Sequence, residues 1–193
     1  MNNLSNKVVW ITGASSGIGE ALAINYSKKG AKVILSARRE DELNRVAKEC
    51  PGETYCQVLD LSKTDEFENI VTLIINQFKK IDILINNGGI SQRSEAYKTS
   101  LDVDRRLMEV NYFGTVALTK AVLPFMQKQK SGHFVAISSL SGKFGFFLRS
   151  AYAASKFALV GFYESLRLEE EKNNIKVSIV FPGFVLTKIS QNS

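Results

Sequence analysis

The chain has few of the residues that bind metal ions or form disulfides. Its 193 residues include one histidine and two cysteines, Cys50 and Cys56. Neither cysteine has a partner histidine or cysteine at the spacing of a metal site, so we predict no metal centre. Two isolated thiols also give no disulfide framework, and we interpret them as reduced groups in a cytoplasmic protein.

Long apolar runs and long runs of one charge are missing as well. The amino end, residues 1–6, is short and polar, and we expect neither a signal peptide nor a membrane span. The formal net charge is +6, but lysines and arginines are interspersed with acids and form no basic block. This pattern argues against a nucleic-acid partner, and a phosphorylated cofactor would account equally well for the mild basic excess.

Short β-branched runs alternate with longer helical patterns along the chain. We predict strands at residues 8–12, 32–37, 54–58, 81–86, 133–138 and 176–181, and helices at 17–29, 40–49, 63–78, 101–128 and 151–173. Most of the strands are apolar on both faces, which is typical of parallel strands covered by helices on either side. The length and the short polar loops predict one α/β domain over residues 1–193, with a doubly wound, Rossmann-like parallel sheet.

A glycine-rich turn, TGASSGIG at positions 12–19, follows the first predicted strand and opens the first predicted helix. In that setting glycines let the backbone approach a pyrophosphate over a helix amino terminus. We predict cofactor contacts from Gly13, Ser15, Ser16, Ile18 and Gly19. A glycine-rich turn alone is often only structural, so this prediction depends on the residues that accompany it.

The second predicted strand ends in Ser36, Ala37, Arg38 and Arg39, without a carboxylate. An acid at this point would bind the ribose 2′-hydroxyl of NAD, whereas an arginine accommodates the 2′-phosphate of NADP. The sequence therefore favours NADP (NADPH), with Arg38 as the better candidate and Arg39 as the second. The alternative is that both arginines are solvated at the start of a helix.

Tyr152 and Lys156 are four residues apart, so on a helix they lie on one face. The pKa of an ordinary tyrosine is about 10 and must fall by about 3 units before the phenol can act as a base near pH 7. A nearby ammonium favours the ionised form and lowers that pKa. Ser138 and Ser139 both end the fifth predicted strand upstream, and either hydroxyl could join this pair.

Together these motifs resemble the short-chain dehydrogenase/reductase superfamily, and segments 7–10, 36–39 and 86–94 are similar to its dehydrogenase/reductase member-seven branch. The resemblance implies an NADP(H)-dependent oxidoreductase, a carbonyl reductase that interconverts a ketone or aldehyde with its alcohol. Two alternatives are a cofactor-binding, redox-sensing module without turnover and a nucleotide-sugar epimerase, which the glycine spacing disfavours.

The same resemblance implies catalytic roles for Asn111, Ser139, Tyr152 and Lys156. Ser139 matches the family spacing and would bind the substrate carbonyl, and Tyr152 would transfer the proton. Lys156 would lower the pKa of Tyr152 and hold the nicotinamide ribose. Asn111 would lie where its helix opens locally around a water that links Lys156 to solvent, unless its side chain only satisfies nearby backbone.

Further cofactor contacts are implied after the later strands, at Asp60, Leu61, Asn87, Gly88, Pro182, Gly183 and Thr187. Asp60 and Leu61 would contact adenine, although Asp60 could equally cap the helix expected from Lys63. Gly88 stands where relatives usually carry alanine, and we interpret this as a variant of the same element.

Three expectations concern the surroundings of the site. The aromatic segment 143–148 would line the edge of the substrate cavity and favour an apolar substrate, although packing in the core explains these residues nearly as well. Residues 91–94 would form the opposite rim of the cavity, or they are a solvated loop. In relatives the two long helices pair across a homodimer or homotetramer. Family members also continue with further helices and a seventh strand, so we expect this chain to be part of a longer protein.

Overall fold

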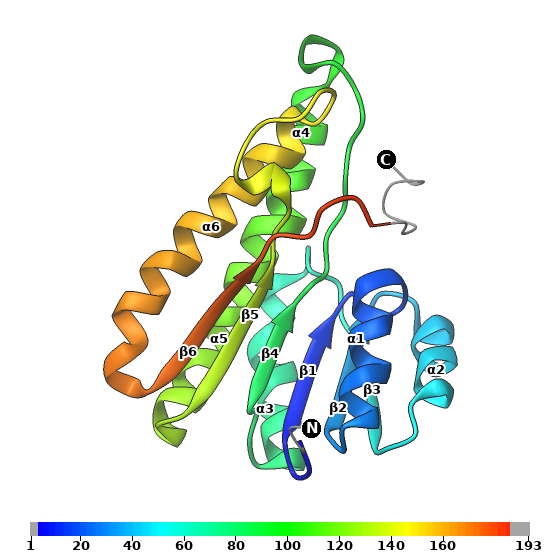
Figure 1. Ribbon diagram of the computed structural model, residues 1–193, viewed down its shortest axis with the longest axis vertical. Helices are drawn as coiled ribbons and strands as arrows, with labels where there is room; N and C mark the ends of the chain where they lie inside the picture. Colours follow the sequence, from blue (N-terminus) through cyan, green and yellow to red (C-terminus); the bar gives the residue numbers. More distant parts are fainter. Residues whose placement is uncertain (1–3, 186–193) are drawn as a thin grey trace.

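A six-stranded parallel sheet forms the centre of the computed structural model, which describes residues 4–185 (Figure 1). The strands run in the order β3-β2-β1-β4-β5-β6, and every neighbouring pair is parallel. Their bounds are β1 Val8–Thr12, β2 Lys32–Ala37, β3 Thr54–Val58, β4 Ile83–Asn86, β5 Gly132–Ile137 and β6 Ile175–Val180. The predicted Rossmann-like fold class is confirmed.

Helices connect all successive strands. Their bounds are α1 Gly17–Lys28, α2 Glu40–Glu49, α3 Phe67–Phe78, α4 Leu101–Met108, α5 Gly114–Gln129 and α6 Ser150–Glu170. Short 3₁₀ turns lie at Thr64–Glu66, Ala96–Lys98, Leu140–Gly142 and Glu171–Asn173. The single helix predicted at 101–128 is wrong in one respect, because a π-helical turn, Glu109–Phe113, separates α4 from α5.

Alternate residues of each central strand pack into two different cores. Val8 and Trp10 of β1 belong to the core under α3, α5 and α6, whereas Val9 and Ile11 belong to the core under α1 and α2. All five residues of β1 are buried. This explains why the strand is apolar on both faces, as expected for a parallel strand in the middle of a doubly covered sheet.

The position of β1 creates the crevice for a ligand. The chain moves outward from β1 to β2 and β3, then returns to place β4 on the other side of β1. Loops that leave the carboxyl ends of β1 and β4 therefore diverge, and open α/β sheets bind ligands at this switch point.

Within residues 4–185, no helix combines the length and apolar character that a membrane crossing requires. In the same part of the chain, no three histidine, cysteine, aspartate or glutamate side chains gather as a potential metal site.

Candidate active site

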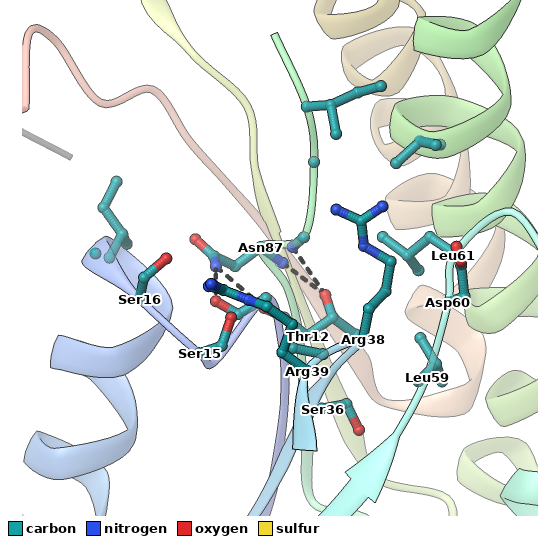
Figure 2. Close-up of a pocket in the computed structure, with 18 of the residues that line it drawn as sticks. Thr12, Ser15, Ser16, Ser36, Arg38, Arg39, Leu59, Asp60, Leu61 and Asn87 are labelled. Atoms are coloured by element: carbon teal, nitrogen blue, oxygen red, sulfur yellow. Dashed lines mark hydrogen bonds between the residues drawn. The ribbon is translucent and has the colours of Figure 1, made fainter. Parts of the chain in front are cut away.

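A cavity of about 480 Å³ opens at the carboxyl ends of β1, β2, β3 and β4 (Figure 2). Most of the residues that we predicted to contact a cofactor line it: Gly13, Ser15, Ser16, Ile18, Arg38, Arg39, Asp60, Leu61, Asn87 and Gly88. Gly19, Lys156, Pro182 and Gly183 do not belong to this lining, and Thr187 lies outside the described residues.

The glycine turn is shaped by the protein's own packing. Gly13 and Gly17 have φ angles of 65° and 61°, in the left-handed region where other residues are strained. A Cβ atom on Gly19 would lie only 2.2 Å from the carbonyl oxygen of Gly13. Gly19 thus has no room for a side chain and supports the turn from behind.

Thr12 and Asn87 join this turn to the loop after β4. The Thr12 hydroxyl oxygen accepts hydrogen bonds from the backbone N–H groups of Asn87 and Gly88, at 3.0 and 2.9 Å. The Asn87 side-chain amide donates to the carbonyl oxygens of Thr12 and Gly13, at 3.0 and 3.2 Å. Sequence reasoning missed Thr12, because the partner that makes it important is 75 residues away.

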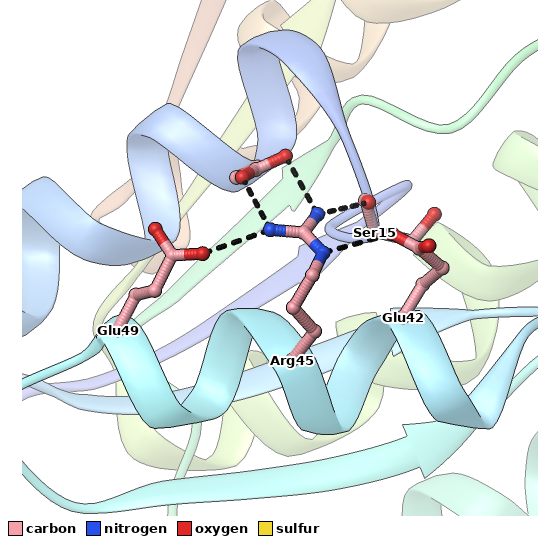
Figure 3. A network of polar contacts seen from close by, with 5 residues as sticks. Ser15, Glu42, Arg45 and Glu49 are labelled. Atoms are coloured by element: carbon pink, nitrogen blue, oxygen red, sulfur yellow. Dashed lines mark hydrogen bonds and ion pairs between the residues drawn. The ribbon is translucent and has the colours of Figure 1, made fainter.

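Arg45 of α2 holds the turn from outside (Figure 3). Its guanidinium binds both carboxylate oxygens of Glu20, at 2.9 and 3.1 Å, and also contacts Glu42 and Glu49. A further N–H donates to the carbonyl oxygen of Ser15 at 3.3 Å. The hydrogen bonds to Glu20 and then Glu42 raise the pKa of Arg45, so this link between α1, α2 and the turn stays charged.

Arg38 and Arg39 both extend from the end of β2 into the cavity, as Figure 2 shows. Asp60 faces the same space and accepts hydrogen bonds from the N–H and hydroxyl of Ser62, at 2.9 and 2.8 Å. Burial pushes the pKa of Asp60 upward, but these hydrogen bonds and the charges of Arg38 and Arg106 outweigh it, and the pKa is lowered.

The alternative role of Asp60 as a helix cap is wrong. Its carboxylate holds a turn at Ser62, while the 3₁₀ turn that precedes α3 begins at Thr64 and receives no side-chain cap.

Ser139 and Tyr152 meet at the carboxyl end of β5. The Ser139 hydroxyl accepts a hydrogen bond from the backbone N–H of Ser141 at 3.1 Å and also hydrogen-bonds the Tyr152 side chain. Ser138 points elsewhere, because its hydroxyl is buried and donates to the carbonyl oxygen of Lys156 at 3.3 Å. The two serines that end the fifth predicted strand thus have different surroundings, and Ser139 is the one beside Tyr152.

The expectation of a lowered Tyr152 pKa is wrong for the protein's own groups. Burial raises the pKa of Tyr152, and the hydrogen bond with Ser139 and the charge of Arg149 offset this only in part. Sequence reasoning missed Arg149 because nothing in the chain around it marks an active-site residue. Burial therefore keeps the phenol protonated in the protein alone, and it also makes the phenol a weaker acid.

Lys156 is buried, with 4% of its surface exposed. Its Nζ atom donates to the carbonyl oxygen of Ile137 at 2.9 Å and lies 5.7 Å from the centroid of the Tyr152 ring. Burial lowers the pKa of Lys156 to about 8. The ammonium group therefore changes its charge in the range where an enzyme is assayed.

The lowered pKa of Lys156 predicts that kcat/KM for the cofactor depends on pH. Because kcat/KM for a nicotinamide cofactor reports ionisations of the free protein, we expect it to fall as pH rises through about 8, where Lys156 loses its charge. Lys172→Met, which removes an exposed lysine, should keep the wild-type profile. A profile that stays flat through this region would contradict the role of Lys156.

Asn111 lies in the π-helical turn and is fully buried. Its amide oxygen accepts from the N–H of Ile90 at 2.8 Å, and its amide nitrogen donates to the Ile90 carbonyl and to the Ser155 hydroxyl, both at 3.0 Å. The helix is thus locally widened at Asn111, as expected. The side chain hydrogen-bonds the backbone of Ile90, 21 residues away in the sequence, and not the backbone of its own helix.

The rim segments lie next to one another. Ser94 donates its backbone N–H to the carbonyl oxygen of Leu148 at 3.2 Å, which ties loop 91–94 to the aromatic segment. Phe144 and Phe147 are 51% and 85% exposed, so core packing does not explain them. Pro182 also lies here, because its carbonyl oxygen accepts from the N–H of Leu140 at 3.1 Å.

The Rossmann-like sheet and the glycine turn at this cavity are typical of a dinucleotide-binding domain, and the comparison with family models identifies the family. The model described as short chain dehydrogenase matches residues 7–193, so the chain belongs to the short-chain dehydrogenase family.

Curated relatives of the chain carry names from one branch of this family. The chain is 50% identical to "Dehydrogenase/reductase SDR family protein 7-like" of Anopheles gambiae, over 99% of its own length and 63% of that protein. It is 46% identical to "Dehydrogenase/reductase SDR family member 7" of Homo sapiens, over 98% of its own length and 58% of that protein. It thus spans about three fifths of these curated relatives.

Solved structures share the fold. A metagenomic short-chain oxidoreductase in complex with NADP superposes with a TM-score of 0.90 at 34% identity, over 95% of this chain and 85% of that one. Levodione reductase gives a TM-score of 0.94 at 28% identity, over 97% and 75% of the two chains. NAD+-bound xylitol dehydrogenase gives 0.92 at 27% identity, over 95% and 72%.

Proposed function

We propose that the protein is an NADP(H)-dependent carbonyl reductase that interconverts a ketone or aldehyde with its alcohol. The hydrogen bond between Ser139 and Tyr152, beside the buried ammonium of Lys156, carries this proposal. NADPH, when bound, supplies the hydride that reduces the carbonyl carbon and leaves as NADP+. The protein's own groups bind the cofactor, orient the carbonyl and deliver the proton.

The cavity suits a dinucleotide with an extra phosphate. Ser16 precedes α1 but makes no side-chain capping hydrogen bond, so the first N–H groups of this helix remain for a pyrophosphate. Arg38 and Arg39 stand at the end of β2, where a 2′-phosphate would lie. Asp60, Leu61, Asn87 and Gly88 would contact the nucleoside parts, and Pro182, Gly183 and Thr187 the nicotinamide.

Tyr152 would donate the proton to the carbonyl oxygen. Its phenol carries a proton in the free protein, and the Ser139 hydroxyl that hydrogen-bonds it can bind the carbonyl oxygen as negative charge develops there. The buried ammonium group of Lys156 would hold the nicotinamide ribose. The opened helix at Asn111 would provide the route by which the proton is replaced from solvent.

The cofactor assignment predicts a strong preference for NADPH. Wild type should favour NADPH over NADH by at least about tenfold in kcat/KM, and Arg38→Ala should remove most of that ratio because a guanidinium–phosphate contact is lost. Arg106→Ala is the matched control, since Arg106 also acts on Asp60 but is not in the cavity lining. An unchanged ratio in Arg38→Ala would mean that Arg39 or Ser15, and not Arg38, binds the 2′-phosphate.

Turnover itself tests the proposal. Purified protein with NADPH and a panel of ketones and aldehydes should consume NADPH and form the alcohols in equal amounts. Binding of NADPH, seen as a raised thermal midpoint, without consumption across the panel would favour the redox-sensing alternative.

We also propose that the protein forms a homodimer or homotetramer through its long helices. Phe113, in the π-helical turn, and Phe157 of α6 are large apolar side chains that remain exposed in the single chain. Light scattering of the purified protein measures the assembly directly, and a monomer would refute the proposal.

A further inference from the structure

Arg149 stands where the cavity meets the proposed proton donor. It immediately precedes α6 and is three residues before Tyr152. Its Nη1 atom donates hydrogen bonds to the Ser91 hydroxyl and, at 2.7 Å, to the carbonyl oxygen of Gln92. Ser91 is itself part of the cavity lining, so the guanidinium borders the cavity through this contact.

The positive charge of Arg149 has no counter-charge in the part of the chain that the structure describes. Its two acceptors are neutral, and neither Arg149 nor Arg93 forms an ion pair with a carboxylate there. Arg45, by contrast, contacts three carboxylates. Burial, and then the like charge of Arg93, lower the pKa of Arg149, so an anion placed beside it would relieve an unfavourable arrangement.

Part of the guanidinium remains available for such an anion. Within residues 4–185, Nη1 is the only atom of this group that makes a hydrogen bond, which leaves the N–H groups on Nε and Nη2 without an acceptor. Two N–H groups on one edge of a guanidinium match the two oxygens of a carboxylate.

An apolar surface lies beside this cation. The segment that leads into Arg149 contains Phe144, Phe146 and Phe147, and the ring of Phe146 contacts those of Phe144 and Phe184 with centroids 5.1 and 6.0 Å apart. Phe144, Phe147 and Phe184 are exposed. Exposed aromatic side chains in contact with one another mark a binding surface for an apolar group.

We propose that the site takes a carbonyl compound with an apolar body and a carboxylate, an oxo acid, whose carboxylate pairs with Arg149 while its carbonyl faces Ser139 and Tyr152. Arg93 adds attraction from the exposed rim. This assignment of a substrate class rests on the reductase function proposed above. Because Arg149 is three residues before Tyr152 and its charge lowers the pKa of that phenol, we expect only a short spacer between carbonyl and carboxylate in such a substrate.

A matched set of substrates tests this. We would compare phenyl oxo acids of increasing chain length with their methyl esters, which keep the carbonyl and the apolar body but lack the charge. Wild type should prefer at least one acid over its ester by about tenfold or more in kcat/KM. Arg149→Gln, which keeps a hydrogen-bond donor for Ser91 and Gln92, should lose most of that ratio, and Arg93→Gln part of it.

The ratio of acid to ester separates charge recognition from other effects of Arg149. A change in the Tyr152 pKa or a looser rim would alter both substrates together and leave the ratio intact. Arg167→Gln removes the same charge from the far end of α6 and should preserve the ratio. If wild type reduces acids and esters equally, or if Arg149→Gln retains the preference, the proposal is overturned while the reductase function stands.

A binding measurement keeps the test independent of turnover. In the presence of NADP+, which cannot reduce the carbonyl, the oxo acid should raise the thermal midpoint of wild type more than its ester does, and Arg149→Gln should remove this difference. A difference without NADPH consumption would refute the reductase function and leave Arg149 as an anion site. Equal shifts by acid and ester would refute the anion site. Should Arg149→Gln fold poorly, Arg93→Gln, at an exposed residue, should still remove part of this difference, and an unchanged difference would contradict the proposal.

Discussion

Replacing Tyr152 by phenylalanine should lower the rate of carbonyl reduction by at least about a hundredfold, the usual contribution of a general acid. The substitution removes one hydroxyl that hydrogen-bonds Ser139 and leaves the ring in place. Tyr152 is not part of the cavity lining, so the affinity for NADPH should stay nearly unchanged. Steady-state rates and titration with NADPH measure the two quantities separately.

The control for this variant is Tyr97→Phe, which removes a phenol that is exposed at the surface. It should have wild-type activity and affinity. Retention of more than a few per cent of the rate in Tyr152→Phe would exclude Tyr152 as the proton donor.

Replacing Gly19 by alanine should weaken NADPH binding by about tenfold or more, which corresponds to about 1.4 kcal/mol. The new Cβ would lie 2.2 Å from the Gly13 carbonyl oxygen and 2.6 Å from Asn87 Nδ2, so the glycine turn must shift. Overpacking of this kind also destabilises a protein, typically by about 1–3 kcal/mol. Titration with NADPH and the thermal midpoint report the two effects.

Gly161→Ala is the matched control, since both glycines lie in helices. A Cβ on Gly161 meets nothing within 4 Å, and alanine is favoured over glycine in a helix by about 0.5–1 kcal/mol. This variant should bind NADPH normally and be slightly more stable. A Gly19→Ala protein with normal affinity would mean that the turn adapts without cost.

The sheet and its order of elements could be predicted because local patterns determine them. Strands β1, β2 and β3 and helix α2 have the predicted bounds, since apolar β-branched runs and their flanking breakers mark them directly. Local patterns did not predict the π-helical turn, and only the family resemblance implied that the helix opens at Asn111. The turn accompanies the pairing of Asn111 with the backbone of Ile90, a contact between distant segments that no local pattern reveals.

The features of the candidate site also divide into those that local motifs predict and those that depend on tertiary packing. The glycine turn and the arginines at the end of β2 are continuous motifs, and the structure places them around one cavity. The pKa of Tyr152 depends instead on burial and on Arg149, which follow from how the rim segments pack. The spacing of Tyr152 and Lys156 suggested an electrostatic partner four residues along the helix, whereas the charge that lowers the Tyr152 pKa belongs to Arg149, three residues before the tyrosine.

The contacts of Thr12 and Asn87 have a consequence for the thermodynamics of cofactor binding. They connect the loops after β1 and β4 through four hydrogen bonds, all within the protein. The conformational entropy of these loops is therefore lost when the chain folds and not when a ligand arrives. A dinucleotide meets a preorganised surface, and more of its interaction energy remains as affinity.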